Sequence, residues 1–221
     1  RDARADAVVL GVRADVDHRQ RRQRDPGRLD LGLAVGVLQD QAQLLIEPME
    51  SEVVARLGET VFGSDDETIE RVLLRLLADR GYTIGTAESM TGGMVSARLT
   101  ELPGSSAVVK GGLVAYDSEL KQRLLGLADV TEVVTTDAAL AMAKGARTLL
   151  DVDVAIAVTG SAGPEPLEKP VGTVIIGVAT PADTRVRELR FSGDRERLRT
   201  YGTAAALHLA RLALIGTWWK E

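Results

Sequence analysis

The sequence contains no cysteine, only two histidines, and few aromatic residues, which make up 3% of the chain. Without cysteine there is no disulfide, no thiol nucleophile and no thiolate metal site. The two histidines, His18 and His208, leave little scope for histidine-based catalysis or metal binding. No apolar run approaches the ~20 residues that a helix needs to span a bilayer. We therefore expect a cytoplasmic protein without a membrane segment.

The chain also lacks an excess of positive charge, because 27 Lys and Arg face 32 Asp and Glu and give a formal net charge of -5. Nucleic-acid binding requires a concentrated basic face, so direct contact with nucleic acid is not expected. What the chain does have is 221 residues, 45% of them hydrophobic. That is enough for one medium-sized domain with a proper core.

Residues 1–43 differ from the rest of the chain, since they contain no Ser, Thr, Lys, Glu, Ile, Met or aromatic residue. Their run "DHRQRRQRDPGR" has no apolar face and predicts a disordered, solvated segment. A basic arm and a wrongly assigned gene start are alternative interpretations. Residues 44–65 are expected to be a connector or the remnant of a preceding domain, with a helix around 49–57 and a short strand at 59–63.

From residue 66 onward, helical and strand patterns alternate, which predicts a layered α/β domain. The clearest helix begins after Asp65 or Asp66 as N-cap and ends at Gly81. The later strands, of which the last two are expected to be antiparallel, lie at 82–87, 111–116, 153–160, 171–180 and 184–192. The later helices are expected at 94–102, 118–126, 135–150 and 194–214.

The first stretch with chemical potential is "ESMTGG", residues 88–93, between an expected strand and an expected helix. Ligands collect at the carboxyl ends of strands in open α/β sheets, and glycines such as Gly92 and Gly93 let them approach the backbone. The stretch is therefore suited to hold an anion or to present Ser89 as a nucleophile. The alternative is a tight turn in which Ser89 or Thr91 caps the helix.

The second stretch is "KGGLVAYDSELKQ", in which Tyr116 ends a strand and Lys121 follows five residues later. Both side chains can transfer protons, and a lysine that is desolvated in a pocket loses pKa and can act as a base. In the alternative interpretation, Lys121 is a surface residue paired with Glu119 or Asp117, and Tyr116 is a half-buried residue at a strand end.

Two further stretches follow. The loop "TGSAGP" carries Thr159, Gly160 and Gly163 at the end of another strand, and it forms either a shared cleft with the first stretch or an ordinary turn. Arg195 lies in the first turn of the last helix, where a cation opposes the helix dipole. This cost suggests that Arg195 binds a phosphate or carboxylate, and the alternative is pairing with a surface acid such as Glu188. His208 is interpreted as structural.

Five ordered motifs, "AESMTGG", "GSSAVVKGGLVAYDSELKQRLLG", "TGSAGP", "KPVGTV" and "FSGDR", closely resemble the C-terminal domain of the CinA family of competence/damage-inducible proteins, over residues 66–217. That domain also exists alone as nicotinamide mononucleotide deamidase, PncC. The resemblance implies a three-layer α/β/α fold with a mixed, mostly parallel sheet, often a homodimer, and neither metal nor cofactor. The N-terminal molybdopterin-binding-like domain of the family is not expected in this sequence, nor is an ADP-ribose pyrophosphatase activity.

The resemblance further implies hydrolysis of nicotinamide mononucleotide to nicotinate mononucleotide and ammonia, within pyridine nucleotide recycling. Ser89 would be the nucleophile, and Tyr116 and Lys121 would transfer protons. Ser106 and Thr159 would line the pocket, and Arg195 would contact the substrate.

The residues themselves agree with this chemistry. Amide hydrolysis without a metal, Cys or His needs an activated hydroxyl, and a neutral lysine is the remaining strong base. Backbone N–H groups from Thr91 to Gly93 are candidates to stabilise the oxyanion. A substrate phosphate needs a cation or a helix terminus, which Arg195 or the glycine loops around Gly160 and Gly163 can supply.

Two departures from the family pattern bear on specificity. Met90 replaces the cysteine of the usual "ESCTGG", and the loop after Pro164, "EPLEK", lacks the glycine pair common in the family. The alternative function is a catalytically inactive module that binds nucleotides or takes part in competence- or damage-related interactions.

Overall fold

The computed structural model describes residues 31–127 and 132–218, and the chain divides into two units between residues 66 and 67. In the first unit, helix α1 (Leu31–Leu57) leads into the 3-10 turn η1 (Gly58–Thr60). The expected helix at 49–57 is present, but it begins within the segment that we expected to be disordered. The prediction of a strand at 59–63 is wrong. The backbone turns from Gly58, which has φ 56°, and residues 61–63 form no strand. Residues 1–30 lie outside the described residues.

The second unit is built on a five-stranded sheet in the order β2-β1-β3-β4-β5. Its strands are β1 (Ile84–Glu88), β2 (Val109–Val114), β3 (Val154–Gly160), β4 (Thr173–Ala179) and β5 (Thr184–Arg190). Strand β1 runs parallel to both β2 and β3, whereas β4 is antiparallel to both β3 and β5. The mixed sheet and the antiparallel pair at its end are confirmed.

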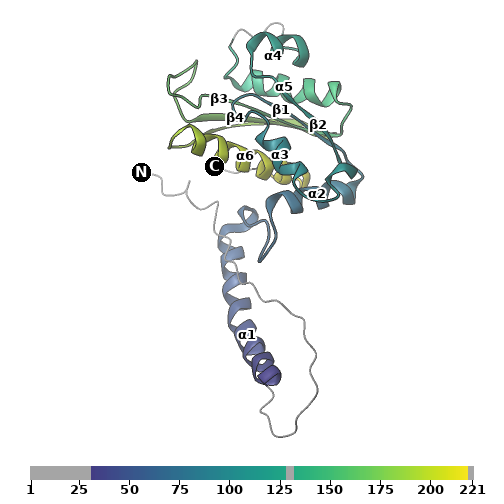
Figure 1. The fold of residues 1–221 in the computed structure, drawn as a ribbon, viewed down its shortest axis with the longest axis vertical. Coiled ribbons are helices and arrows are strands. Elements are labelled where there is room, and N and C mark those ends of the chain that lie inside the picture. Colours follow the sequence, from purple (N-terminus) through teal and green to yellow (C-terminus); the bar gives the residue numbers. More distant parts are fainter. Residues whose placement is uncertain (1–30, 128–131, 219–221) are drawn as a thin grey trace. The chain divides into compact units, whose positions relative to one another are not determined.

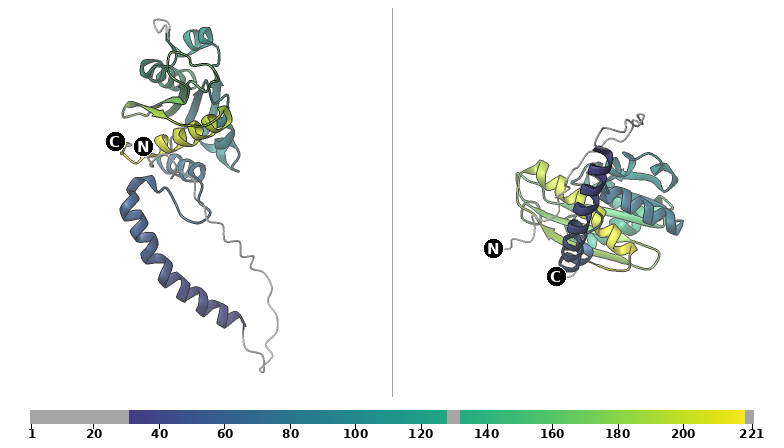
Figure 2. Two further views of the ribbon diagram at one scale, coloured as in Figure 1. Left: turned by 90° about the vertical axis from the view of Figure 1, so that its left-hand side faces the viewer. Right: turned by 90° about the horizontal axis from the view of Figure 1, so that it is seen from below.

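Helices cover both faces of the sheet, which gives three layers (Figures 1 and 2). Helices α2 (Ile69–Arg80), α3 (Met94–Thr100) and α6 (Arg195–Leu214) lie on one face, and α4 (Ser118–Leu125) and α5 (Thr136–Leu149) lie on the other. Strands β3 and β4 are buried along their whole length because both faces are covered. None of the described helices combines the length and the apolar character that crossing a bilayer requires.

Two local predictions need correction. The N-cap of α2 is Thr68, whose Oγ1 accepts a hydrogen bond from the N–H of Arg71, and not Asp65 or Asp66. The strand expected to be buried at 111–116 is the edge strand β2, whose residues alternate between half-buried and exposed. Because β2 pairs only with β1 and ends at Val114, Tyr116 lies beyond the strand.

Candidate active site

The carboxyl ends of the three parallel strands meet at one edge of the sheet. Glu88, the last residue of β1, is in register with Val114 of β2 and with Val158 of β3. The N–H of Ser89 donates to the carbonyl of Val158 at 2.9 Å and so extends the β1–β3 ladder by one residue. Ser89 therefore lies at the edge where α/β sheets bind their ligands.

The pleat of the sheet fixes the side to which Ser89 points. Ala87 and Ala157 belong to the core cluster that packs against α4 and α5. Successive side chains alternate between faces, so Ser89 and Thr159, two residues further on, point to the same side. Lys121 belongs to α4, which covers this side of the sheet. Ser89 and Lys121 are thus at the same edge and on the same side, and both are buried.

Lys121 is only 3% exposed, and its Nζ donates to the backbone carbonyl of Tyr116 at 3.3 Å. Burial lowers the pKa of this ammonium below its usual value, while the carboxylates of Glu168 and Asp117 act in the opposite direction. The predicted desolvated lysine is therefore present, and the alternative of a solvated surface lysine does not apply. A lowered pKa increases the fraction of the amine that is neutral and therefore able to accept a proton.

Glu168 and Thr159 both bind the backbone of Val133. Glu168, whose charge acts on the pKa of Lys121, accepts a hydrogen bond from the N–H of Val133 at 3.2 Å. The Oγ1 of Thr159 donates to the carbonyl of the same Val133 at 2.7 Å. The hydroxyl of Thr159 therefore holds the segment before α5 in place. Sequence analysis missed Glu168, because nothing in "EPLEK" distinguishes it from Glu165.

The turn after Ser89 contains both occupied and unoccupied backbone N–H groups. The N–H of Gly92 donates to the carbonyl of Ser89 at 3.0 Å, and the N–H of Gly93 donates to Glu88 Oε2 at 3.0 Å. These two donors are occupied, so of the candidate N–H groups from Thr91 to Gly93 only that of Thr91 remains. Among the described residues, neither Met90 nor Thr91 has a partner for its N–H. The candidate oxyanion donors are therefore the two N–H groups that directly follow Ser89.

Glu88 organises the start of α3 and was missed by sequence analysis. Its fully buried carboxylate accepts hydrogen bonds from the N–H groups of Gly93, Val95 and Ser96 and from Ser96 Oγ. Neither Ser89 nor Thr91 caps this helix, contrary to the alternative interpretation, because its N-cap is Gly93 and lacks a side-chain cap. A carboxylate six residues before the helix is outside the usual capping pattern, so no sequence signal identified it.

Arg199, also missed, joins α6 to the turn. Its Nε donates to the carbonyl of Met90 at 3.0 Å and its Nη2 to the carbonyl of Thr91 at 2.9 Å. Its only sequence signal is its position one helical turn after Arg195, on the same face of α6. Thr91 is fully buried, and its Oγ1 has no hydrogen-bond partner among the described residues.

Arg195 connects two other predicted site residues. It donates from Nη1 to the carbonyl of Gly163 at 2.9 Å and from Nη2 to Tyr116 Oη at 2.7 Å. Glu188, a possible surface partner of Arg195, binds Lys169 instead. The structure therefore brings Tyr116, Gly163 and Arg195 together.

Gly160 allows the turn after Ser89 to pack directly on the end of β3. A β-carbon at Gly160 would lie 2.4 Å from Met90 Sδ and 2.4 Å from the carbonyl oxygen of Thr173. Met90 is buried, so the residue that replaces the usual cysteine is a packing residue here. The close contact explains why this position is a glycine.

Ser106 is the one predicted site residue that the structure places elsewhere. It is exposed and belongs to the 3-10 turn η2 (Ser105–Ala107), directly before β2. Because Val109 at the start of β2 pairs with Ile84 at the start of β1, Ser106 lies at the amino edge of the sheet, opposite to Ser89.

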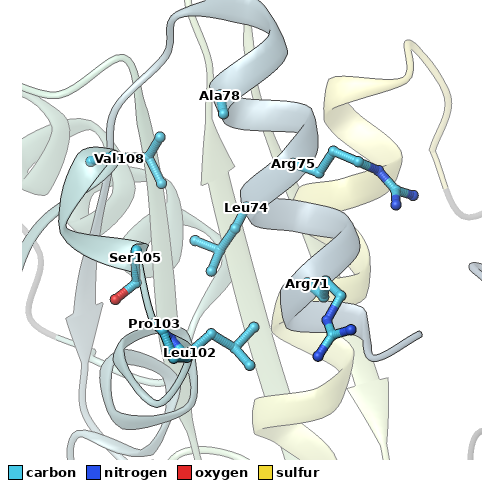
Figure 3. A pocket seen from close by; sticks show the side chains of 10 residues that line it. Arg71, Leu74, Arg75, Ala78, Leu102, Pro103, Ser105 and Val108 are labelled. Carbon is cyan, nitrogen blue, oxygen red and sulfur yellow. The ribbon is translucent and has the colours of Figure 1, made fainter. Parts of the chain in front are cut away.

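A pocket of about 370 Å³ also lies at this amino edge (Figure 3). It is lined by Arg71, Leu74, Arg75, Ala78, Leu102, Pro103, Gly104, Ser105, Ala107 and Val108. It contains none of the predicted site residues, and it is separate from the edge that carries Ser89.

The chain matches the family model described as "CinA C-terminal domain" over residues 66–214. It is 44% identical over 181 residues to a "CinA-like protein" of Frankia casuarinae, covering 80% of this chain and 42% of that protein. It is 42% identical over 186 residues to a "Putative competence-damage inducible protein" of Desulforamulus reducens, covering 82% of this chain and 45% of that protein. The chain thus spans less than half the length of these relatives.

Two solved structures have a similar fold. The competence/damage inducible protein CihA from Agrobacterium tumefaciens superposes with a TM-score of 0.63 at 35% identity, covering 70% of this chain and 98% of that one. A CinA superfamily protein from Klebsiella pneumoniae gives a TM-score of 0.62 at 30% identity, covering 68% of this chain and 99% of that one. The aligned part of this chain therefore corresponds to nearly the whole of each solved chain.

Proposed function

This chain belongs to the CinA C-terminal domain family, and from that premise we propose that it hydrolyses the carboxamide of nicotinamide mononucleotide to nicotinate mononucleotide and ammonia. The observation that carries the proposal is Lys121, a buried amine with a lowered pKa at the same edge and side of the sheet as Ser89. Together they supply the activated hydroxyl and the base that amide hydrolysis requires.

In the first step, the neutral Nζ of Lys121 accepts the proton of Ser89 Oγ, and Oγ attacks the carboxamide carbon. The N–H groups of Met90 and Thr91 donate to the oxyanion of the tetrahedral intermediate. The Lys121 ammonium then gives its proton to the amide nitrogen, the C–N bond breaks, and ammonia leaves. An ester between Ser89 and the nicotinoyl group remains.

In the second step, water attacks this ester. Lys121 accepts a proton from the water, and a second tetrahedral intermediate forms with its oxyanion on the same two N–H groups. Lys121 returns the proton to Ser89 Oγ as the ester bond breaks, and the released carboxylic acid loses its proton to water to give the carboxylate product. The carbonyl of Tyr116 accepts a hydrogen bond from Lys121 Nζ and thereby keeps the amine oriented.

Arg195 is our candidate for the substrate phosphate. Its two observed hydrogen bonds use two of its five N–H donors, and the residue is exposed. A planar fork of donors suits a phosphate. Tyr116 lies beside Arg195, so its phenol is placed to contact the substrate or to take part in the proton transfers of the reaction.

Ammonia release from nicotinamide mononucleotide by the purified chain tests the proposal. Ser89→Ala and Lys121→Ala are expected to reduce turnover by at least about 1,000-fold, as loss of a nucleophile or base does in other covalent hydrolases. Lys144→Ala, at an exposed lysine of α5, is the matched control and should leave turnover unchanged.

Wild-type rates from both Ser89→Ala and Lys121→Ala would refute the assigned roles. Calorimetric binding of the mononucleotide without any ammonia release would favour the inactive nucleotide-binding module. A homodimer, which the family resemblance implies, remains a proposal that light scattering of the purified chain tests.

A further inference from the structure

The guanidinium of Arg199 holds two successive backbone carbonyls of the turn that follows Ser89. Its Nε reaches Met90 O at 3.0 Å and its Nη2 reaches Thr91 O at 2.9 Å. Hydrogen bonds from a charged donor are stronger than neutral ones, and two from one rigid fork fix both carbonyls in direction. Arg199 comes from α6, on the face of the sheet opposite to α4 and α5.

The direction of a carbonyl determines the direction of the N–H in the same peptide. In a trans peptide the C=O and the N–H point to opposite sides. The carbonyl of Met90 and the N–H of Thr91 share one peptide, so a carbonyl that faces Arg199 sends this N–H away from α6. Ala87 points toward α4 and α5, and the alternation of side chains along the extended ladder assigns Ser89, two residues further on, to that same side, opposite to α6.

The Met90–Thr91 peptide is also the central peptide of a turn, because the N–H of Gly92 donates to the carbonyl of Ser89. The central peptide is the unit whose direction differs between type I and type II turns. In the flipped form, the Met90 carbonyl would face Ser89 and present a negative dipole to the oxyanion. Arg199 opposes this flip, and the β-branched Thr91, which has no positive φ, disfavours it as well.

From this geometry we propose that Arg199 is a positioning residue for catalysis: it aims the N–H of Thr91 at the oxyanion that forms beside Ser89. The positive charge further polarises the Met90–Thr91 peptide, which makes the N–H of Thr91 a better donor. Arg199 acts through the backbone and does not touch the substrate. The inference rests on the proposed nucleophilic role of Ser89.

The first test compares steady-state kinetics of the full chain with those of Arg199→Ala and Arg199→Lys. Arg199→Ala is expected to lower kcat about 100-fold, the typical effect of losing one oxyanion donor, while KM changes by less than about threefold. Arg199→Lys should fall between the two, because an ammonium cannot span both carbonyls. Added guanidinium chloride at low concentration should restore part of kcat to Arg199→Ala only.

Arg197→Ala is the matched control. Arg197 lies on the same helix, is exposed, and places its guanidinium over the ring of Tyr201 instead of the turn. This variant should keep wild-type kcat. The positioning role is refuted if Arg199→Ala keeps the wild-type kcat. It is also refuted if Arg199→Ala loses kcat, guanidinium chloride restores none of it, and KM rises by the same factor.

A second test does not depend on the substrate. 3-Pyridineboronic acid is expected to form a tetrahedral adduct with Ser89 Oγ, which boron NMR detects, and whose oxygen occupies the oxyanion position. Affinity should fall about 100-fold in Arg199→Ala, and the adduct should vanish in Ser89→Ala.

Together, the kinetic test and the boronic-acid test distinguish the proposed deamidase activity from the proposed positioning role of Arg199. A tetrahedral adduct that needs Arg199, in a protein that does not deamidate the mononucleotide, refutes the proposed substrate and supports the positioning role. Equal affinity in wild type and Arg199→Ala, or no tetrahedral adduct in the wild type, refutes the positioning role.

Discussion

Arg195 Nη2 donates a hydrogen bond to Tyr116 Oη at 2.7 Å, which joins the start of α6 to the segment that follows the edge strand β2. The same guanidinium holds the carbonyl of Gly163, so three segments far apart in the sequence meet at one cation. Tyr116 is 57% exposed, and this meeting point therefore lies on the open side of the candidate site. The proposed role of Arg195 is to bind the anionic group of the substrate at this point.

We expect Arg195→Ala to remove the preference for a phosphorylated substrate. A charge-assisted contact contributes about 1.5–3 kcal/mol, so kcat/KM for the mononucleotide should fall about 10- to 100-fold. Turnover of nicotinamide riboside, which lacks the phosphate, should change much less. Arg190→Ala, at an exposed arginine of β5, is the control. An unchanged ratio between the two substrates in Arg195→Ala would contradict the assignment.

The pH dependence of the reaction is expected to follow Lys121 and to respond to Glu168. A base must be neutral to accept a proton, so kcat/KM should rise with pH through the lowered pKa of Lys121. The carboxylate of Glu168 raises that pKa, and Glu168→Gln removes this charge while keeping an acceptor for the N–H of Val133. The rising limb of the pH–rate profile should therefore move to lower pH.

Glu165→Gln provides the control for this shift, because it removes an exposed carboxylate from the same loop. Its profile should coincide with that of the wild type. A limb that stays in place in Glu168→Gln, or moves to higher pH, would show that Lys121 is not the titrating base.

The elements of the fold were predictable where local signals define them. The final helix begins after its N-cap Asp194, and β4 and β5 form the expected antiparallel pair, because caps and apolar periodicity are encoded within a few residues. The position of β2 at the edge of the sheet was not predictable, since an edge strand and a central strand can share the same apolar residues. Its exposure follows from having a single neighbour in the sheet.

In the candidate site, the sequence motifs indicated the side chains expected to react, but not the residues that fix the surrounding backbone. Arg199 lies 109 residues from Met90, and its target is a backbone carbonyl, which carries no sequence signal. Ser106 was wrongly grouped with Ser89 because the register of β2 places it at the other edge of the sheet. Such contacts depend on strand order and helix placement, which short motifs do not encode.

Loss of Glu88 is expected to destabilise the fold as well as the site. In Glu88→Ala, the N–H groups of the buried Val95 and the half-buried Ser96 lose a charged acceptor, so the free energy of unfolding should fall by about 3 kcal/mol or more. Urea denaturation measures this change. Glu101→Ala, at an exposed glutamate that follows α3, should stay within about 0.5 kcal/mol of the wild type. A similar stability of both variants would contradict the capping role of Glu88.

His208 makes the stability of the fold depend on pH. Burial, and then the nearby cation of Arg211, lower the pKa of His208 to about 4. Between pH 6.5 and about 4 the unfolded chain binds a proton at this residue and the folded chain does not, so stability is full above pH 6.5 and falls as the pH approaches 4. A shift of this size corresponds to about 3 kcal/mol.

His208→Gln removes this titration while the carboxylates still titrate in both proteins. The difference between their urea-denaturation curves at pH 7.5 and 4.5 should therefore isolate the histidine, with the wild type losing more stability on acidification. Equal losses in the two proteins would show that residue 208 is not a buried, neutral histidine. The test needs no activity, because His208 is buried within α6 and plays no part in the proposed chemistry.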